Sequence, residues 1–153
     1  MAKLLILTAE PENFVPKQLK KVAEENGFEV EMINPDECYI NLSNDEEYIS
    51  YGGTKFMGAD WCIPRLSEEN MEYKIAIMHH LKSMGVKMLN DPMGMRLASN
   101  KLETQIVLNK RGIRTPKTVM ITDAEQLDYA VKALDEKFPM IVKTLFGTHG
   151  VGV

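Results

Sequence analysis

The first 33 residues alternate between two apolar runs and a helical pattern, and this order constrains the fold more than any other feature. The apolar runs, at residues 3–8 and 29–33, are typical of short buried strands. Between them, one helical face precedes Gly27, a typical helix stop, and it contains Val15, Leu19, Val22, Ala23 and Asn26. Strand, helix, strand predicts a parallel pair with a right-handed crossover, the opening unit of an open α/β sheet.

The same alternation continues to residue 89 and predicts an α/β fold for the whole segment. The pair Gly52-Gly53 lies between short polar-apolar segments, which predicts a hairpin with a primed turn. A later helical stripe, stopped by Gly85, contains Met71, Ile75, Met78 and Leu81. The remaining predicted elements are buried strands at 60–63 and 86–89, with this helix at 69–84 between them.

The run Asn90-Asp91-Pro92 breaks the pattern and predicts a boundary between domains at residues 1–91 and 92–153. The second domain begins with helices at 93–97 and 100–110, followed by a strand at 118–121. A capping box formed by Thr122 and Glu125 predicts another helix, which Phe138-Pro139 ends. A final apolar strand is predicted at 140–142.

The stretch after this last strand is rich in glycine. Lys143 follows the strand, and Gly147, Gly150 and Gly152 allow backbone N–H groups to approach an anion closely. The spacing G-x-x-G-x-G matches neither the Walker loop nor the dinucleotide-binding fingerprint. A phosphate cover and a flexible hairpin or frayed end are both compatible with the glycines alone. Since a returning strand should start near Val153, we expect a fragment or one half of a split protein.

Composition excludes several function classes. The net charge of −4 gives no overall field that favours nucleic acid or an anionic membrane. No apolar run reaches the length of a membrane span, and the N-terminus lacks the cleavage region of a signal peptide, so we expect a cytoplasmic protein. Cys38 and Cys62 are too few and too far apart for a zinc site or a disulfide framework, which predicts reduced, partly buried thiols.

Three further positions are candidates for chemistry. Lys101, near a helix start, could point a cation into a cleft or belong to a solvated helix face. Arg65 follows an apolar strand and a proline, so it could bind a carboxylate or phosphate, or form a surface ion pair. The run from Asp36 to Tyr39 could line the same crevice at the sheet edge as Arg65, although acidic residues after Asn-Pro more often form a turn. His79 and His80 lie about 100° apart on a helix and cannot share a metal unaided.

Six blocks of the chain together resemble the RimK-type ATP-grasp ligases. Five of them come in the family's order, at residues 60–65, 85–90, 100–104, 111–118 and 138–143 with 147–152. The sixth, Asn34-Pro35-x-x-Cys38-Tyr39-Ile40-Asn41, is similar to the N-terminal part of RimK proteins that add glutamate to a ribosomal protein tail. The resemblance covers the whole chain.

The resemblance implies a pre-ATP-grasp open parallel or mixed sheet domain, followed by an incomplete first ATP-grasp subdomain. It implies that Lys143 contacts the α-phosphate and the adenine side of ATP and that Lys101 approaches the phosphates. Arg65 would face the acceptor. The residues implied to cover the phosphates are Gly147, Thr148, His149, Gly150 and Gly152, with His149 standing where the family often has Gln.

The function that the resemblance implies is an ATP-dependent carboxylate-amine ligase. ATP would phosphorylate a carboxylate on a protein tail or a small molecule, and an amine such as that of glutamate would displace the phosphate. The Mg²⁺ ligands are expected in a C-terminal part that this chain lacks, so it would be inactive alone and need a separate C-terminal half. No catalytic or metal-binding residue is assigned within the chain, and the intact family suggests a homo-oligomer. A non-catalytic module that binds an acceptor or partner remains the alternative.

Overall fold

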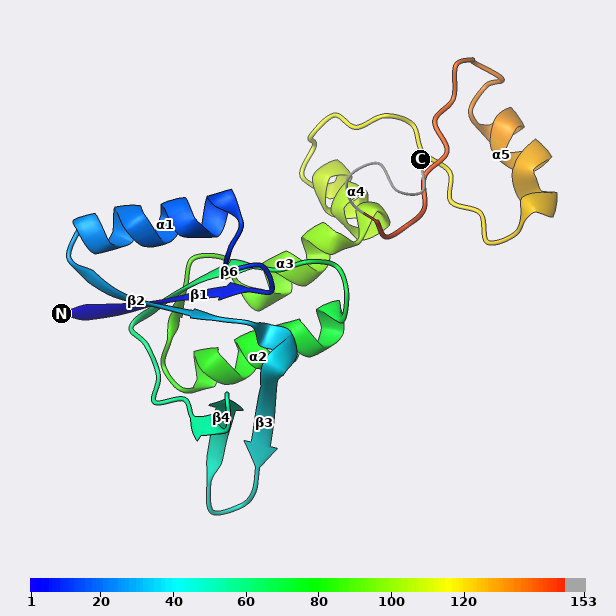
Figure 1. Ribbon diagram of the computed structural model, residues 1–153. Coiled ribbons are helices and arrows are strands. Elements are labelled where there is room, and N and C mark those ends of the chain that lie inside the picture. The colour runs from blue at the N-terminus through cyan, green and yellow to red at the C-terminus, as the bar shows by residue number, and fades with distance from the viewer. Residues whose placement is uncertain (148–153) are drawn as a thin grey trace. The chain divides into compact units, whose positions relative to one another are not determined.

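A computed structural model of the chain describes residues 1–147. Its contacts divide the chain into two compact units, Met1–Arg96 and Leu97–Val153, here called the first and second units. This division follows contacts, whereas the predicted boundary at 91/92 follows a break in the sequence pattern and stays a prediction. Figure 1 shows the elements of both units in chain order.

The first unit is built on a parallel four-stranded sheet with the strand order β2-β1-β6-β7. The strands are β1 (Ala2–Thr8), β2 (Phe28–Ile33), β6 (Trp61–Arg65) and β7 (Lys87–Met88). Helix α1 (Phe14–Glu25) connects β1 to β2, and α2 (Met71–Ser83) connects β6 to β7. Both connections join parallel neighbours, so the predicted open α/β sheet is confirmed.

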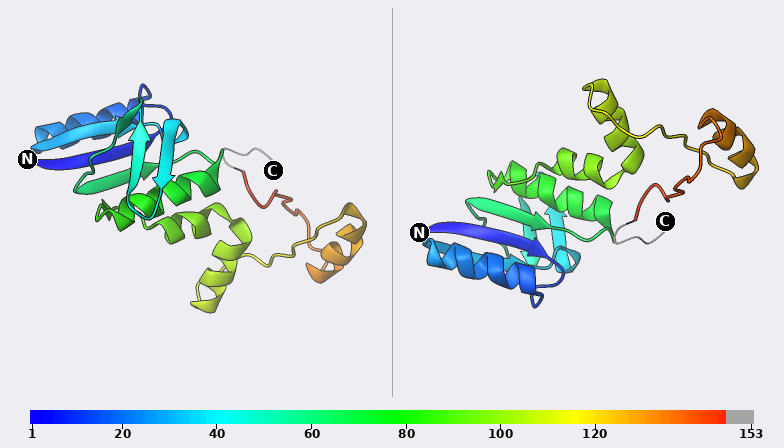
Figure 2. Two further views of the ribbon diagram at one scale, coloured as in Figure 1. Left: turned by 90° about the horizontal axis from the view of Figure 1, so that it is seen from below. Right: turned by 90° about the horizontal axis from the view of Figure 1, so that it is seen from above.

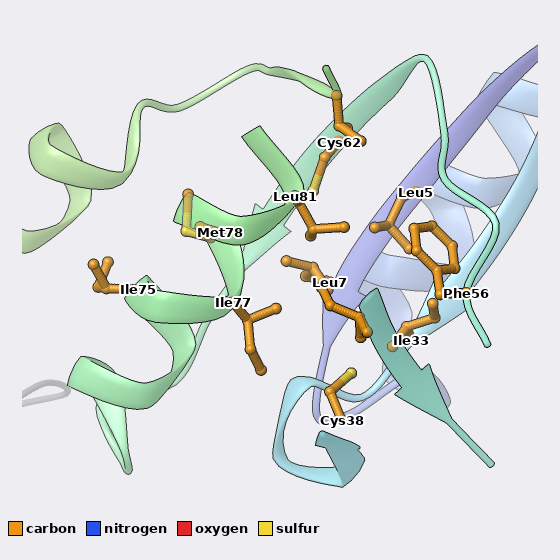
Figure 3. Packing of buried hydrophobic residues seen from close by; sticks show 12 residues of the cluster. Leu5, Leu7, Ile33, Cys38, Phe56, Cys62, Ile75, Ile77, Met78 and Leu81 are labelled. Atoms are coloured by element: carbon orange, nitrogen blue, oxygen red, sulfur yellow. The ribbon is translucent and has the colours of Figure 1, made fainter. Parts of the chain in front are cut away.

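The two helices cover opposite faces of this sheet, as both views of Figure 2 show. The face toward α2 carries the core, where Leu5 and Leu7 of β1 pack against Ile77, Met78 and Leu81 of α2 (Figure 3). These five side chains are at most 1% exposed, because alternate residues of the strand face α2 and apolar residues recur every three to four positions along the helix.

A three-stranded antiparallel sheet completes the core on this face. It consists of β3 (Cys38–Leu42), β4 (Glu47–Tyr51) and β5 (Thr54–Lys55), and it contributes Cys38 and Ile49 to the core. Gly52 and Gly53 adopt positive φ angles of 56° and 76° between β4 and β5, which confirms the predicted hairpin with a primed turn. Strand β3 was not predicted, because the turn signal of the residues before it concealed its start.

Helix α1 is buried to only a small extent. Pro16, which is not on the predicted helical face, is the only buried residue of the helix. Val15 is 43% and Val22 is 54% exposed. The helix covers only the β1–β2 half of its face of the sheet, so part of its apolar stripe lies beyond the strands that it packs on.

The second unit contains short helices joined by extended segments. Helix α3 (Pro92–Ser99) spans the division between the units, and it is followed by α4 (Lys101–Lys110), the 3-10 turn η2 (Ala124–Gln126) and α5 (Leu127–Ala133). The predicted capping box is wrong by one position, since Asp123 accepts from the Glu125 N–H and Gln126 accepts from the Thr122 N–H. Phe138-Pro139 is not the helix end, because α5 stops at Ala133.

The predicted strands at 118–121 and 140–142 are wrong, because neither segment pairs with another strand among the described residues. Ile141 and Val142 are 72% and 74% exposed. A strand requires a hydrogen-bonded neighbour as well as apolar side chains, and the described part of the second unit provides none.

Candidate nucleotide and acceptor sites

The start of α4 fixes the position of Lys101. The side-chain oxygen of Asn100 accepts hydrogen bonds from the N–H groups of Leu102 and Glu103, both at 3.1 Å. In return, the Asn100 amide donates to the Glu103 carboxylate at 3.2 Å. This cap satisfies backbone donors that the first helical turn leaves free, so the helix begins at Lys101.

Lys101 contacts the start of the glycine-rich loop. Its Nζ donates to the carbonyl of Gly147 at 2.7 Å and to that of Leu145 at 3.4 Å, and its backbone N–H donates to the Leu145 carbonyl at 3.3 Å. Gly147 has a φ of 126°, a conformation that favours glycine. The interpretation of Lys101 as part of a merely solvated helix face is therefore wrong, since the side chain is half-buried against the loop.

Lys143 and four residues of the glycine-rich stretch are the other predicted nucleotide contacts. Lys143 is exposed and does not follow a strand as predicted. Thr148, His149, Gly150 and Gly152 lie outside the described residues. The structure thus brings together Lys101 and Gly147, two of the seven residues predicted to bind ATP.

Arg65 lies in the first unit, at the carboxyl end of β6 and in register with Thr8 at the end of β1. Thr8 is 3% exposed, and its hydroxyl accepts from the Glu10 N–H at 3.2 Å. The strand order reverses between β1 and β6, and open parallel sheets bind ligands beyond the carboxyl ends at such a point. Arg65 is exposed and has no ion pair within the described residues, so a cation is available there.

A buried lysine near the same sheet edge was missed by the sequence analysis. Lys74 on α2 is 0% exposed, and its Nζ contacts Ser67 Oγ at 2.7 Å and an Asp36 carboxylate oxygen at 2.9 Å. Asn70 donates to the other Asp36 oxygen at 3.3 Å. The signal was available, because Lys74 occupies the apolar stripe of α2 just before Ile75, where a buried cation requires a partner.

Asp36 therefore has two roles that the sequence presented as alternatives. Its N–H donates to Asn34 Oδ1 at 3.1 Å in the 3-10 turn η1 (Pro35–Glu37), and its carboxylate neutralises Lys74. The turn interpretation is correct for the backbone. The carboxylate thereby links the turn after β2 to helix α2.

Neither cysteine is a candidate nucleophile. Both are free, as predicted, and both are buried rather than partly buried. Burial raises the pKa of each thiol to about 12, and for Cys38 the nearby Glu37 and Asp36 carboxylates act in the same direction. A thiol with such a pKa stays protonated and unreactive at neutral pH.

The two units match two successive family models. Residues 2–95 match the RimK PreATP-grasp domain, and residues 98–153 match the RimK-like ATP-grasp domain. The chain belongs to the RimK family. The predicted fold class, a pre-ATP-grasp α/β domain followed by an incomplete ATP-grasp subdomain, is thereby confirmed.

Individual proteins are similar to this chain in sequence or in fold. The chain is 32% identical over 151 residues to the probable alpha-L-glutamate ligase 2 of Shewanella baltica, covering 99% of this chain and 50% of the relative. The ATP-grasp RimK domain protein of Sphaerobacter thermophilus shares its fold with a TM-score of 0.69 at 18% identity, over 97% of this chain and 51% of that one. D-alanyl-alanine synthetase A of Vibrio cholerae gives a TM-score of 0.71 at 15% identity, over 99% and 50%. The chain spans about half the length of the curated relatives it matches.

The charged groups of the RimK-like segment suit a phosphate better than a metal ion. Lys101 carries a cation against the start of the loop, and Lys143 is exposed. Among residues 1–147, by contrast, no group of three acidic, His or Cys side chains could hold a metal. The described helices also include none that is long and apolar enough to cross a membrane.

Proposed function

We propose that the chain is the N-terminal part of an ATP-dependent carboxylate-amine ligase of RimK type, which adds an amino acid such as glutamate to an acceptor through an acylphosphate. The observation that carries the proposal is the contact of Lys101 with Gly147, inside the segment that matches the RimK-like ATP-grasp domain. The name of the Shewanella relatives, probable alpha-L-glutamate ligase, supports glutamate as the amino acid.

The residues of this chain would bind and orient ATP. Lys101 would exchange its bonds to the Gly147 and Leu145 carbonyls for a phosphate oxygen, with Lys143 as a second cation. The stretch from Gly147 to Gly152, including Thr148, His149 and Gly150, would cover the phosphates with its backbone N–H groups. Positioning and charge neutralisation of this kind carry most of the catalysis of phosphoryl transfer.

Mg²⁺ would neutralise the phosphates during transfer. Since the described residues supply no acidic cluster for it, its ligands belong to the half of the relatives that this chain does not span. These 153 residues alone are therefore proposed to be inactive, and the part of the relatives that they do not span would complete the site.

Arg65 is proposed to bind the acceptor, a protein tail or a small carboxylate. Its guanidinium can hold a carboxylate with two parallel hydrogen bonds, and it stands at the strand-order reversal of the sheet. Lys74 and Asp36 neutralise each other and leave Arg65 as the available cation of this edge. We place the protein in the cytoplasm, where ATP and ribosomal acceptors are found.

Binding of ATP tests the proposal. Calorimetry of the chain with Mg-ATP should give a dissociation constant of about 1 mM or weaker, which corresponds to about −4 kcal/mol.

Adding the C-terminal half of a RimK relative should produce ADP release that depends on glutamate and acceptor. K101A and K143A should reduce this release, whereas K110A, an exposed lysine at the end of the same α4, should not. Equal activity of K101A and K110A would remove the assigned role of Lys101.

A non-catalytic module that binds an acceptor is the second candidate. It is favoured by the concentration of buried core in the first unit, which carries Arg65 and matches a domain model of its own. If this candidate is correct, glutamate-rich peptides should bind to the chain and R65A should abolish binding. No C-terminal half should then restore turnover.

A further inference from the structure

An apolar groove of about 410 Å³ lies on the face of the sheet that carries α1. Leu19 and Val22 of α1 form one wall, Phe28 of β2 lies in the floor, and Trp61, Ile63 and Leu89 form the other side. Asn26 is the only polar side chain of its lining. The groove is thus an apolar surface lined by residues of the first unit alone.

The groove exists because the two crossover helices lie on opposite faces of the sheet (Figure 2). Helix α1 packs beside β1 and β2, whereas α2 and its core, with Leu5, Leu7 and Cys62, lie on the other face. Within Met1–Arg96, no described element covers β6 and β7 on the α1 face. Trp61, Val22 and Leu89 are accordingly 42%, 54% and 67% exposed.

The charges of α1 run against its dipole. Lys17, Lys20 and Lys21 precede Glu24 and Glu25, and the first turn has no acidic residue and the last turn no basic one. A helix dipole favours the opposite order, with acidic residues at the N-terminus and basic residues at the C-terminus. The order becomes favourable if a second helix of the same sequence lies antiparallel to the first, because each basic half then faces an acidic half.

We propose that the groove is covered by α1 of a second copy of this chain, packed antiparallel about a two-fold axis near Val22 and Ala23. In this arrangement Val22 of each copy fills the space beside Trp61 of the other, and Lys21 faces Glu25 of the second copy. The contact is isologous, since the same patch serves on both copies. It gives a defined surface to the homo-oligomer predicted from the family resemblance.

The positions of the side chains around α1 separate this proposal from a general charge effect. At about 100° per residue, Lys21 and Glu25 lie next to each other on one side of Val22, whereas Lys20 and Glu24 lie on the opposite side of the helix. The two pairs are otherwise alike, because Lys20 contacts Glu24 at 3.8 Å and Lys21 contacts Glu25 at 3.9 Å. Lys20 therefore offers a matched control for Lys21.

The first test is concentration dependence of the full 153-residue chain. The single tryptophan, Trp61, lines the groove and reports on its cover. We expect sedimentation to show a dimer with a dissociation constant on the order of 10 μM, in the range of a small interface, and Trp61 emission to move to shorter wavelength over the same concentrations. A monomer with unchanged Trp61 emission up to 500 μM, roughly fifty times that constant, would overturn the proposal.

Cross-linking and charge reversal locate the interface. Under mild oxidation V22C should form a disulfide-linked dimer and K20C should not. Cys38 and Cys62 are buried and serve as internal negative controls.

Charge reversal tests the same interface. K21E should weaken the dimer about tenfold by placing like charges opposite each other, K20E should leave it unchanged, and the swap K21E/E25K should restore it. Equal effects of K21E and K20E, or a dimer without V22C cross-linking, would show that another surface associates and would overturn the assignment. Trp61 emission that shifts only on adding the C-terminal half of a RimK relative would overturn it in favour of that half as the occupant.

Discussion

The two units of the chain differ in what they do with apolar side chains. In the first unit, apolar residues of strands and helices are buried against each other, whereas Ala130 is the only buried hydrophobic residue described in the second. The second unit nevertheless carries large apolar side chains, such as Phe138 at 73% and Ile141 at 72% exposure. The difference follows from strand pairing, because β1 has a hydrogen-bonded neighbour on each side and the predicted strands of the second unit have none among the described residues.

Separating the units should have the largest effect. A protein of residues 1–96 should unfold cooperatively with heat, since it retains both sheets and the whole α2 core. A protein of residues 97–153 should show no cooperative transition, because ordering its backbone costs about 1–2 kcal/mol per residue and little apolar burial offsets this cost. Circular dichroism during heating measures both. A cooperative transition in 97–153 would show that its exposed apolar segments find partners within the unit.

Truncation of one side chain in each unit should give the next largest effect. I77A removes most of a side chain that is 0% exposed and should lower the free energy of unfolding by about 3–4 kcal/mol through lost burial and a cavity. I141A is the matched control in the second unit and should change it by less than about 0.5 kcal/mol. Urea unfolding followed by circular dichroism gives both values. A similar cost for I141A would mean that Ile141 is buried in solution.

The ion pair of Lys74 and Asp36 should rank third. D36A leaves the buried Lys74 ammonium with only the Ser67 hydroxyl and should cost about 2 kcal/mol, below the 3–5 kcal/mol of fully buried pairs because the Asp36 side chain is 28% exposed. D36A/K74M removes the orphaned charge as well and should recover most of the loss. A double variant that is less stable than D36A would show that the pair contributes net stability, and urea unfolding distinguishes the two outcomes.

The sequence predicted the first unit well because its signals are local and agree with each other. The apolar run of β1, the glycines of the β4–β5 turn and the stop at Gly85, whose φ is 89°, each determine one element. Residues 118–121 and 140–142 have equally clear apolar patterns, yet the strands predicted there are wrong. Their state depends on a pairing partner distant in sequence or on another chain, which no local pattern specifies.

The candidate sites were predictable to a different extent. Lys101 and Gly147 were named from the family resemblance, and the structure places them together, although their role with ATP stays a prediction. Lys74 was missed because it interrupts an apolar stripe in which only hydrophobic positions were counted. The groove beside α1 could not be predicted, since the face that a helix leaves open depends on the order of strands in the sheet.

The smallest effect concerns the two thiols of the first unit. Burial raises the pKa of Cys62 from its usual value near 9 to about 12, so between these pH values the thiol keeps its proton in the folded state and loses it in the unfolded state. The unfolded state then binds fewer protons, and stability must fall as the pH rises. The contribution of Cys62 is complete below pH 9 and should decrease by about 1.4 kcal/mol at pH 10.

Urea unfolding at pH 8 and pH 10 measures this loss, and C62V should reduce the difference because it removes the titrating group while filling a similar volume. Tyr73, whose pKa burial also raises, titrates in the same direction and remains in both proteins, so the comparison isolates the thiol. An unchanged pH dependence in C62V would show that Cys62 ionises in the folded protein. Such ionisation would require α2 to move away from Cys62. The core of the first unit would then be packed less tightly than the burial of Leu81 and Met78 indicates, and the two units would differ less.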